Sequence, residues 1–265
     1  MRINRLRPFG ARHASRSLSL LVVMGLALAA ATPAWADGTV SGSAYAVSVN
    51  ANVAGINVTA GPTPTVTLPP TGGNLSQSVV SICAGTGCSV LSAGVLNAAT
   101  QGSTTAAPSS TGSASAATVN VLNGVLTADL ISSKCTADSS GTTGSASLVN
   151  AKLSGATIAA NPGPNTTLTV AGLATVILNE QTVSSSGGTN SITVNAVHVK
   201  LNLGVATGDI IIAQSHCDAT PGAVVPTGTI GILGLTGLAG IGFAFVQFRG
   251  YRRRLAAAAA AQSAL

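Results

Sequence analysis

Four cysteines are the residues with the clearest potential chemistry in this chain, because in an oxidising compartment they form two disulfides in one of three pairings. Cys83 and Cys88 enclose only four residues, two of them glycines, which permits a tight closed turn. Cys135 and Cys217 each follow a segment of similar sequence, TADLI and TGDII. We favour Cys83–Cys88 with Cys135–Cys217, whose loop of about eighty residues would contribute roughly 4–5 kcal/mol in the chain-entropy model.

A metal site is the competing interpretation of these residues, since His216 adjoins Cys217. Zinc sites take four ligands at characteristic short spacings, and no second C-x-x-C or H-x-x-x-H motif follows. His198 is the other histidine after the N-terminal segment, and it lies on the polar side of an alternating stretch, where we expect a solvated side chain. We predict no metal ligands and no cofactor.

Hydrolytic chemistry lacks its usual sequence motifs. Glu180 is the only glutamate, and no second acid lies near it in sequence, so paired-carboxylate hydrolysis is unsupported. A Ser/His/Asp triad can be assembled on paper from any serine-rich chain, and no G-x-S-x-G elbow is present. We predict no catalytic residues and a protein that is not an enzyme.

The C-terminal end indicates a membrane anchor. Residues Thr229–Phe248 form twenty uncharged positions, the length that a helix needs to cross the hydrocarbon core. Arginine clusters of the kind that follows stay on the cytoplasmic side. We expect a linker at 221–228, one transmembrane helix at 229–248 and a cytoplasmic tail at 249–265, which begins with Arg249, Arg252, Arg253 and Arg254.

The N-terminal end indicates export. A basic start precedes the apolar run LSLLVVMGLALAAA, and Ala34-Trp35-Ala36 has the small-x-small pattern of signal peptidase sites. A second membrane span is the alternative, but fourteen apolar residues are too few for it. We expect a signal peptide at 1–36, cleaved between Ala36 and Asp37. The protein would then be a single-pass membrane protein with an extracellular domain and a cytoplasmic C-terminus.

Charge in the exported part excludes one class of partner. Nine of the twelve basic residues lie in the two terminal segments, which leaves Lys134, Lys152 and Lys200 between Asp37 and Gly228. Six acidic residues in the same part give it a net charge of −3. Nucleic-acid binding needs a clustered basic face, and three dispersed lysines do not form one. We therefore predict that the protein does not bind nucleic acid.

Alternation of apolar and polar residues predicts the fold of residues 37–220. Tyr45 to Val53 and Val197 to Leu203 alternate at the period of half-buried strands, and glycine- and proline-rich turns divide such stretches. We expect an all-β, antiparallel, sandwich-like domain with a core of Val, Ile, Leu and Ala, because Tyr45 is its only aromatic residue. The serine-rich stretch 100–117 is expected to be a long surface loop, or else a linker between two lobes.

Two segments resemble the sortase signal L-P-x-T-G. Leu68–Gly72 matches it but lies far from the C-terminal span, so we interpret it as a proline-rich turn. Val225–Gly228 stands at the right place but lacks the residue between Pro and Thr. The apolar span is therefore the expected anchor, and attachment to the wall by sortase stays an alternative.

The segments VILNEQ (176–181), ITVNAVHV (192–199) and GDIIIAQSH (208–216) resemble the choice-of-anchor P surface proteins of actinobacteria. The resemblance covers about Gly38 to Ala219. It implies an exported β-rich domain joined to a C-terminal anchor, and it implies no established activity.

These observations favour a non-enzymatic cell-envelope protein with a structural or adhesive role. A self-associating surface coat is the first alternative, because weakly charged strands of small residues leave sheet edges poorly protected. An extracellular ligand-binding module is the second. The expected partners are the membrane and either cell-wall components or further copies of the chain.

Overall fold

The computed structural model describes residues 34–203 and 206–225. The expected span Thr229–Phe248, its four arginines and most of the signal peptide lie outside these ranges. Among the described residues, no helix is long and apolar enough to cross a membrane. The chain divides into two units, Ala36–Ala223 and the two terminal segments together. In the second unit β1 (Ala34–Trp35) pairs antiparallel with β17 (Val224–Val225).

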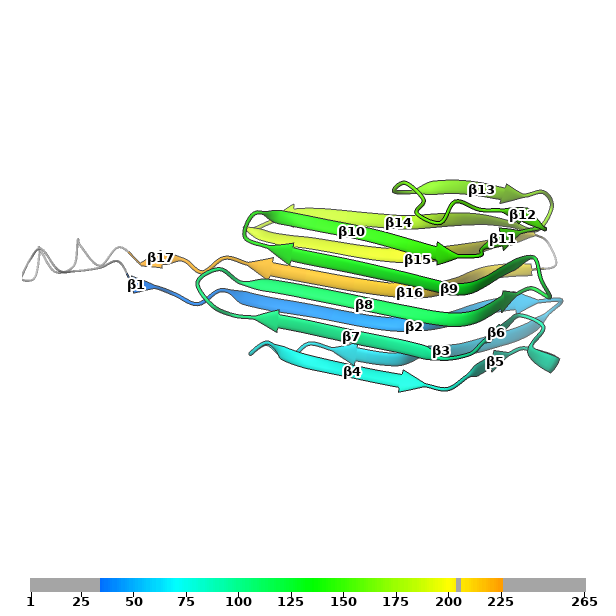
Figure 1. Cartoon of the computed structure of the whole chain (residues 1–265), viewed down its shortest axis with the longest axis horizontal. Coiled ribbons are helices and arrows are strands. Elements are labelled where there is room, and N and C mark those ends of the chain that lie inside the picture. Colours follow the sequence, from blue (N-terminus) through cyan, green and yellow to red (C-terminus); the bar gives the residue numbers. More distant parts are fainter. Residues whose placement is uncertain (1–33, 204–205, 226–265) are drawn as a thin grey trace, which may run out of the picture. The chain divides into compact units, whose positions relative to one another are not determined.

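The unit Ala36–Ala223 is all-β, and its strand pairs are antiparallel, as the alternation predicted (Figure 1). One sheet has six strands in the order β13-β14-β15-β16-β2-β3. From β13 to β16, strands that are consecutive in the sequence are also neighbours in the sheet. These strands are β13 (Thr166–Val170), β14 (Ala174–Ser186), β15 (Thr189–Leu203), β16 (Ala206–Thr220), β2 (Thr39–Val53) and β3 (Ile56–Thr67).

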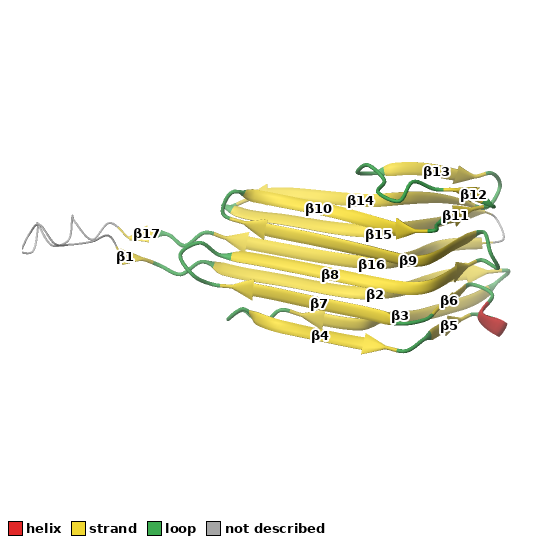
Figure 2. Ribbon diagram, viewed as in Figure 1, coloured by secondary structure: helices red, strands yellow, loops and turns green. Residues whose placement is uncertain are grey.

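The second sheet has nine strands, but several of them continue one another in a single line. β5 continues β4, β6 continues β7, and β11 continues β10, on either side of the long central strands β8 and β9. A single turn of 3-10 helix, Thr86–Cys88, joins β5 to β6 (Figure 2). The strands are β4 (Gly73–Val79), β5 (Ile82–Ala84), β6 (Leu91–Ala93), β7 (Leu96–Ser103), β8 (Ser109–Val121), β9 (Leu126–Asp138), β10 (Gly141–Val149), β11 (Lys152–Leu153) and β12 (Ala156–Thr157).

Turn residues behave largely as predicted. Gly187 and Gly188 both have positive φ and form the two-residue turn of the β14–β15 hairpin, since a turn that matches the strand twist needs this conformation. Leu68–Gly72 is a turn between β3 and β4, in which the Gly72 N–H donates to the Pro69 carbonyl at 2.9 Å. Gly61-Pro62, a dipeptide typical of turns, instead lies inside β3.

In both sheets the alternation of buried and exposed residues along the strands is interrupted at one row of residues that crosses the sheet, here called the reversal row. Buried positions are even-numbered on one side of such a residue and odd-numbered on the other. In β9, Leu126 and Ala128 are buried before the row, and Ile131 and Ser133 are buried after it. The register is unchanged across the row from β14 to β2 and from β8 to β9, so these strands reverse at the same level, whereas the register shifts between β2 and β3. The rows are Asn179, Ala196, Ala213 and Ala46 in the six-stranded sheet, and Ser81, Gly94, Thr118, Asp129 and Asn150 in the nine-stranded sheet.

Backbone conformation explains the reversal at four of these positions. Asn179, Ala213, Thr118 and Asn150 have φ between 50° and 53°, in the left-handed region. One such residue inside an extended strand turns the following side chains to the opposite face, as a bulge does. Two half-strands of opposite parity can therefore share one buried face.

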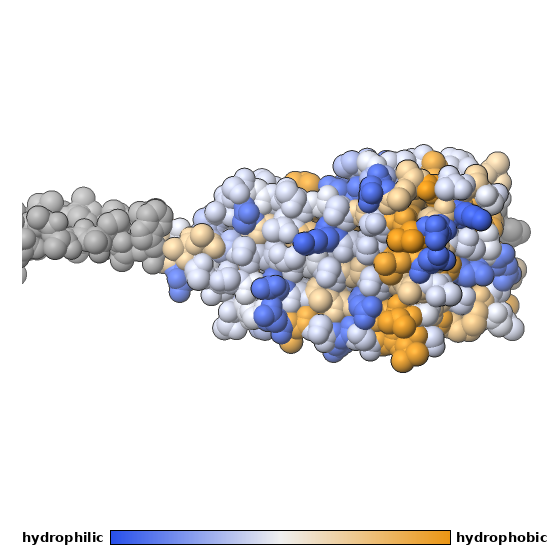
Figure 3. Space-filling model, in the orientation of Figure 1, coloured by the Kyte–Doolittle hydropathy of each residue, from blue (hydrophilic) through white to orange (hydrophobic). Residues whose placement is uncertain are grey.

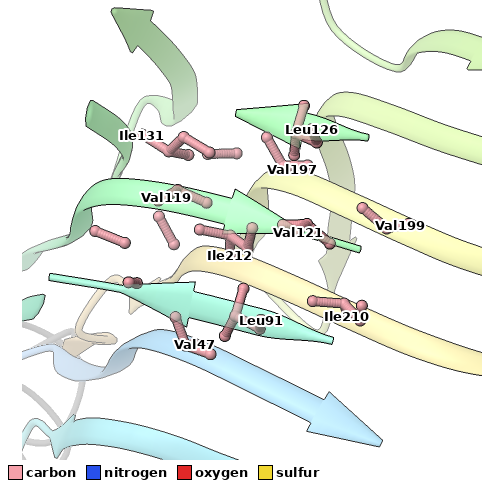
Figure 4. Close-up of a cluster of buried hydrophobic side chains, with 14 of the residues drawn as sticks. Val47, Leu91, Val119, Val121, Leu126, Ile131, Val197, Val199, Ile210 and Ile212 are labelled. Atoms are coloured by element: carbon pink, nitrogen blue, oxygen red, sulfur yellow. The ribbon is translucent and has the colours of Figure 1, made fainter. Parts of the chain in front are cut away.

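The two sheets stack face to face over one core. On the β6 and β11 side of the reversal rows the buried side chains are large, among them Leu91, Val121, Leu126 and Ile210 (Figure 4). On the other side large buried side chains such as Leu96, Ile131 and Ile192 are interspersed with many small ones, which allow a close approach of the sheets at Gly112. Small residues at buried positions there include Gly42, Ala44, Ser110, Gly112, Ala114, Ser133, Ala137, Ser215 and Ala219.

The two disulfides of the structure agree with the favoured pairing. Cys135 of β9 and Cys217 of β16 are bonded across the two sheets, with Cα atoms 6.0 Å apart and both side chains fully buried. The two similar segments TADLI and TGDII thus lie on strands that face each other. Cys83 and Cys88 close the turn that contains the 3-10 helix.

The expected loop or linker at 100–117 is wrong. Residues 96–103 form β7, residues 109–121 form β8, and β8 pairs with β7 and β9 in the interior of its sheet. Small residues that seemed to lack a hydrophobic anchor are the ones that fit between closely spaced sheets. Ala36–Ala223 is therefore a single unit, and the two-lobe alternative falls with the linker.

Removal of the buried disulfide should destabilise the domain far more than removal of the short one. Cys135→Ala/Cys217→Ala opens a loop of 82 residues and empties two fully buried sites, so we expect a loss of about 2–5 kcal/mol. Cys83→Ala/Cys88→Ala opens a loop of five residues and should lose clearly less. Urea unfolding of the two variants measures the difference, and equal losses would contradict this assignment.

Close sheet spacing at the disulfide makes a sharp prediction for Gly112 of β8. A Cβ at this position would lie 3.1 Å from Sγ of Cys135 and 3.3 Å from Sγ of Cys217. Gly112→Ala should therefore cost about 1–3 kcal/mol by overpacking. Gly163→Ala is the matched control, because its nearest neighbour would be Thr166 Oγ1 at 3.7 Å. Thermal unfolding of both variants is the measurement, and a Gly112→Ala protein as stable as the control would refute the close approach.

Candidate functional site

Three titratable side chains meet on the outer face of the six-stranded sheet, the face turned away from the nine-stranded sheet. His198 of β15 lies between Glu180 of β14 and Asp209 of β16. Its Nδ1 is 2.7 Å from Oε2 of Glu180, and its Nε2 is 2.8 Å from Oδ1 of Asp209. This Glu180–His198–Asp209 cluster is the candidate functional site.

The expectation that His198 is solvated is wrong. Its side chain points outward, as the alternation predicted, but only 9% of the residue is exposed. The pairing register places Ile177 and Ile211 directly beside it on the two neighbouring strands. With a carboxylate on each ring nitrogen as well, little of the imidazole remains in contact with water.

The reversal row brings the cluster together. Asn195 and His198 are three residues apart and would point to opposite faces of a regular strand. Because Ala196 lies in the reversal row, both point outward, and Asn195 donates from Nδ2 to Oε2 of Glu180 at 2.7 Å. Sequence reasoning found no acid near Glu180, whereas the fold places Asp209 on the same imidazole.

A ladder of amides extends the cluster across the sheet. Gln214 of β16 donates from Nε2 to Oδ1 of Asn195 at 2.7 Å, in the same row of paired residues. Tyr45 of β2 stands next to Gln214 in that row, and burial raises the pKa of its hydroxyl to about 12. Lys200 lies 3.7 Å from Oε1 of Glu180. The three adjacent strands β14, β15 and β16 are thus tied through side chains as well as through their backbones.

The charge of Glu180 is stabilised where it lies. Burial on its own raises the pKa of this carboxyl. Hydrogen bonds from Asn195 and His198, together with the positive charges of His198 and Lys200, outweigh burial and lower the pKa below its ordinary value. Glu180 is therefore an ionised hydrogen-bond acceptor at neutral pH.

A second cluster lies on the same face, nearer the disulfide. His216 of β16 contacts Thr193 Oγ1 at 2.9 Å through Nδ1 and Asp218 Oδ2 at 3.0 Å through Nε2. Ser41 donates to the same Asp218 oxygen at 2.6 Å. Burial raises the pKa of Asp218, but hydrogen bonds from Ser191 and Ser41 and the charge of His216 lower it overall.

The geometry of the two clusters suits a structural role, in which they hold neighbouring strands together, better than a role in proton transfer. Both contacts of His198 are hydrogen bonds only when both ring nitrogens carry hydrogen, which leaves neither nitrogen free to accept a proton from a third group. Cys217, which made a site with His216 conceivable, is bound in the disulfide. Within residues 34–203 and 206–225, no group of three or more His, Cys, Asp or Glu side chains is arranged to hold a metal ion.

An apolar crevice is a separate feature at the edge where β11, β12 and β13 lie. Its volume is about 510 Å³, within the range of small-molecule sites. Its polar groups include Asn161 of the loop between β12 and β13, and Thr166 and Thr169 of β13. Apolar side chains line most of it: Leu153, Ile158, Leu168, Val170 and Leu178.

No protein-family model, no curated protein and no solved structure matches this chain. The resemblance to the choice-of-anchor P surface proteins therefore stays a prediction. The fold and the Glu180–His198–Asp209 cluster are described from this chain alone.

Loss of the Glu180 charge should weaken the sheet in a pH-dependent way. Glu180→Gln leaves His198 and Lys200 without their shared anion, and we expect a loss of about 1–3 kcal/mol at neutral pH. Because the folded-state pKa is lowered, this contribution is complete above the ordinary value of about 4.3 and is lost as pH falls through the folded pKa.

Urea unfolding of wild type and Glu180→Gln between about pH 7 and about pH 3 measures this difference, which should shrink towards the acid end. Asp37→Asn is the control, since it removes the same charge at an exposed position. A difference that stays constant over the whole range would show that the charge of Glu180 has no part in it.

Proposed function

We propose that this protein is a non-enzymatic component of the cell envelope, a β-sandwich domain held outside the membrane by a C-terminal apolar span. One observation carries the proposal: the boundaries of the compact unit, Ala36 and Ala223, agree with the processing expected from the sequence. β2 begins at Thr39, so cleavage before Asp37 would leave every strand of both large sheets intact. The other boundary falls within the expected linker at 221–228.

Disulfide bonding supports the proposed location. Such bonds persist in exported proteins and are rare in the cytosol. Both disulfides of the described residues join cysteines of the exported part, and one of them is fully buried between the sheets.

A structural or adhesive role fits the organisation of the domain better than chemistry does. His198 binds Glu180 and Asp209 on the two neighbouring strands, and His216 and Asp218 bind Thr193 and Ser41 on the strands beside them, so these polar groups stiffen the sheet. A stiff, weakly charged module with broad hydroxyl-rich faces suits contact with other surface components. Cell-wall components or further copies of the chain are the partners we propose.

Ligand binding is a second candidate function, and the crevice beside β13 favours it. A site of this size lined by leucine, isoleucine and valine suits a small apolar molecule. We rank it below the structural role, because carbohydrate ligands usually stack on aromatic side chains and none lines this crevice.

Topology on living cells tests the main proposal. Protease added to intact cells or protoplasts should remove the domain and spare the C-terminal tail, and the mature N-terminus should be Asp37. Deletion of Thr229–Phe248 should release the domain into the medium. Digestion of the tail with protection of the domain would show that the proposed orientation is wrong. Retention of the protein until the wall is digested would instead indicate that Val225–Gly228 is a sortase site.

A further inference from the structure

The outer face of the nine-stranded sheet carries a row of exposed apolar side chains, here called the apolar row. Leu130 of β9 pairs with Val149 of β10 on one side and with Ala117 of β8 on the other. Ala117 donates its N–H to the Val95 carbonyl, and the β4–β7 register continues to Val80. The exposed fractions are 82% for Val80, 51% for Val95, 37% for Leu130 and 43% for Val149.

Four of the seven large apolar residues that are exposed in the described chain thus stand in one line across the sheet. Five strand positions at about 4.8 Å spacing make the row roughly 20 Å long. The apolar row lies one residue away from the reversal row of the same sheet on each strand. The orange areas towards the right of the face in Figure 3 lie in this region.

Polar rows flank the apolar row on both sides. On one side Ser78 donates to Oδ1 of Asn97, and Asn97 donates to Ser115. On the other side Asn150 donates from Nδ2 to Oδ2 of Asp129 at 2.6 Å. An apolar centre with a hydrogen-bonding rim is the usual anatomy of a protein interface.

We propose that this face binds the same face of a second copy of the chain. Charge favours this occupant, because the charged side chains described on the face balance to zero, whereas the exported part as a whole is negative. All of them lie on one side of β8: Asp129, Lys134, Asp138 and Lys152. A two-fold axis along β8 places the charges of each copy over the uncharged β6–β7 half of the other, so no like charges meet.

The same axis makes the apolar row self-complementary. It lays Val80 and Val95 of one copy over Val149 and Leu130 of the other, and it places the small Ala117 of both copies at the centre. The thirteen residues of β8 and five strand positions give a face of about 1,000 Å². A stable interface needs roughly 800 Å² from each partner, so the face is large enough.

Cross-linking of the full-length protein in membranes tests this dimer. Ala117→Cys places a thiol on the proposed axis, and the four native cysteines are engaged in disulfides. A short bismaleimide should link two copies at least tenfold more efficiently than in Ser48→Cys, whose thiol lies on the outer face of the other sheet. Equal yields from the two variants would overturn the proposal.

A positive charge introduced into the apolar row gives a second test of the dimer. Leu130→Lys or Val95→Lys, added to Ala117→Cys, should lower the yield of cross-linked dimer at least tenfold. Val183→Lys is the control, because Val183 is 57% exposed on β14 and should leave the yield unchanged. Exposed positions keep the fold, and the thermal unfolding midpoint of each variant checks this.

Undiminished dimers in both lysine variants would also overturn the proposal, as would cross-links of Ala117→Cys to other proteins alone. The inference concerns one sheet face and holds on either side of a membrane. A reversed topology would therefore refute the proposed location and leave the dimer standing.

Discussion

The close approach of the two sheets at the Cys135–Cys217 bond is the constraint on which the rest of the domain depends. A disulfide between β9 and β16 fixes the distance between the layers, and at Gly112 a Cβ would already lie 3.1 Å from Sγ of Cys135, so a larger side chain does not fit there. The small residues of β8 and β10 follow from that distance, as does a core without aromatic side chains. Because small side chains bury little area, the domain depends on the bond and on extensive strand pairing for its stability.

The reversal rows link this narrow end to both outer faces. Without them, half of every long strand would turn its apolar side chains to solvent, since a change of parity moves the whole set. With them, the core is continuous, and outward positions at odd spacing become neighbours. Asn195 and His198 meet on one face for this reason, and the apolar row of the other face lies beside the same kind of reversal.

Local alternation was readable from the sequence, and distant pairing was not. Tyr45 to Val53 shows its strand directly, and the spacing of the four cysteines led to the pairing that the structure contains. The strand β8 was missed because a core of Ser, Gly and Ala has no hydrophobic period to detect. The cluster around His198 was missed because it needs both the strand order and the reversal at Ala196. A polar residue three positions from another within one strand is the only local sign of such a reversal.

The two outer faces differ in a way that bears on what the domain can bind. On the six-stranded sheet the polar groups satisfy one another, so a partner there would have to break hydrogen bonds that already exist. On the nine-stranded sheet burial of the apolar row releases water without breaking a hydrogen bond, and the flanking polar rows, which are hydrogen-bonded among themselves, lie at the rim. Association is therefore favoured on the nine-stranded sheet, and the six-stranded sheet acts as its rigid support. With the proposed dimer the domain combines a stiff body with one face for association, which fits the structural or adhesive role proposed for it.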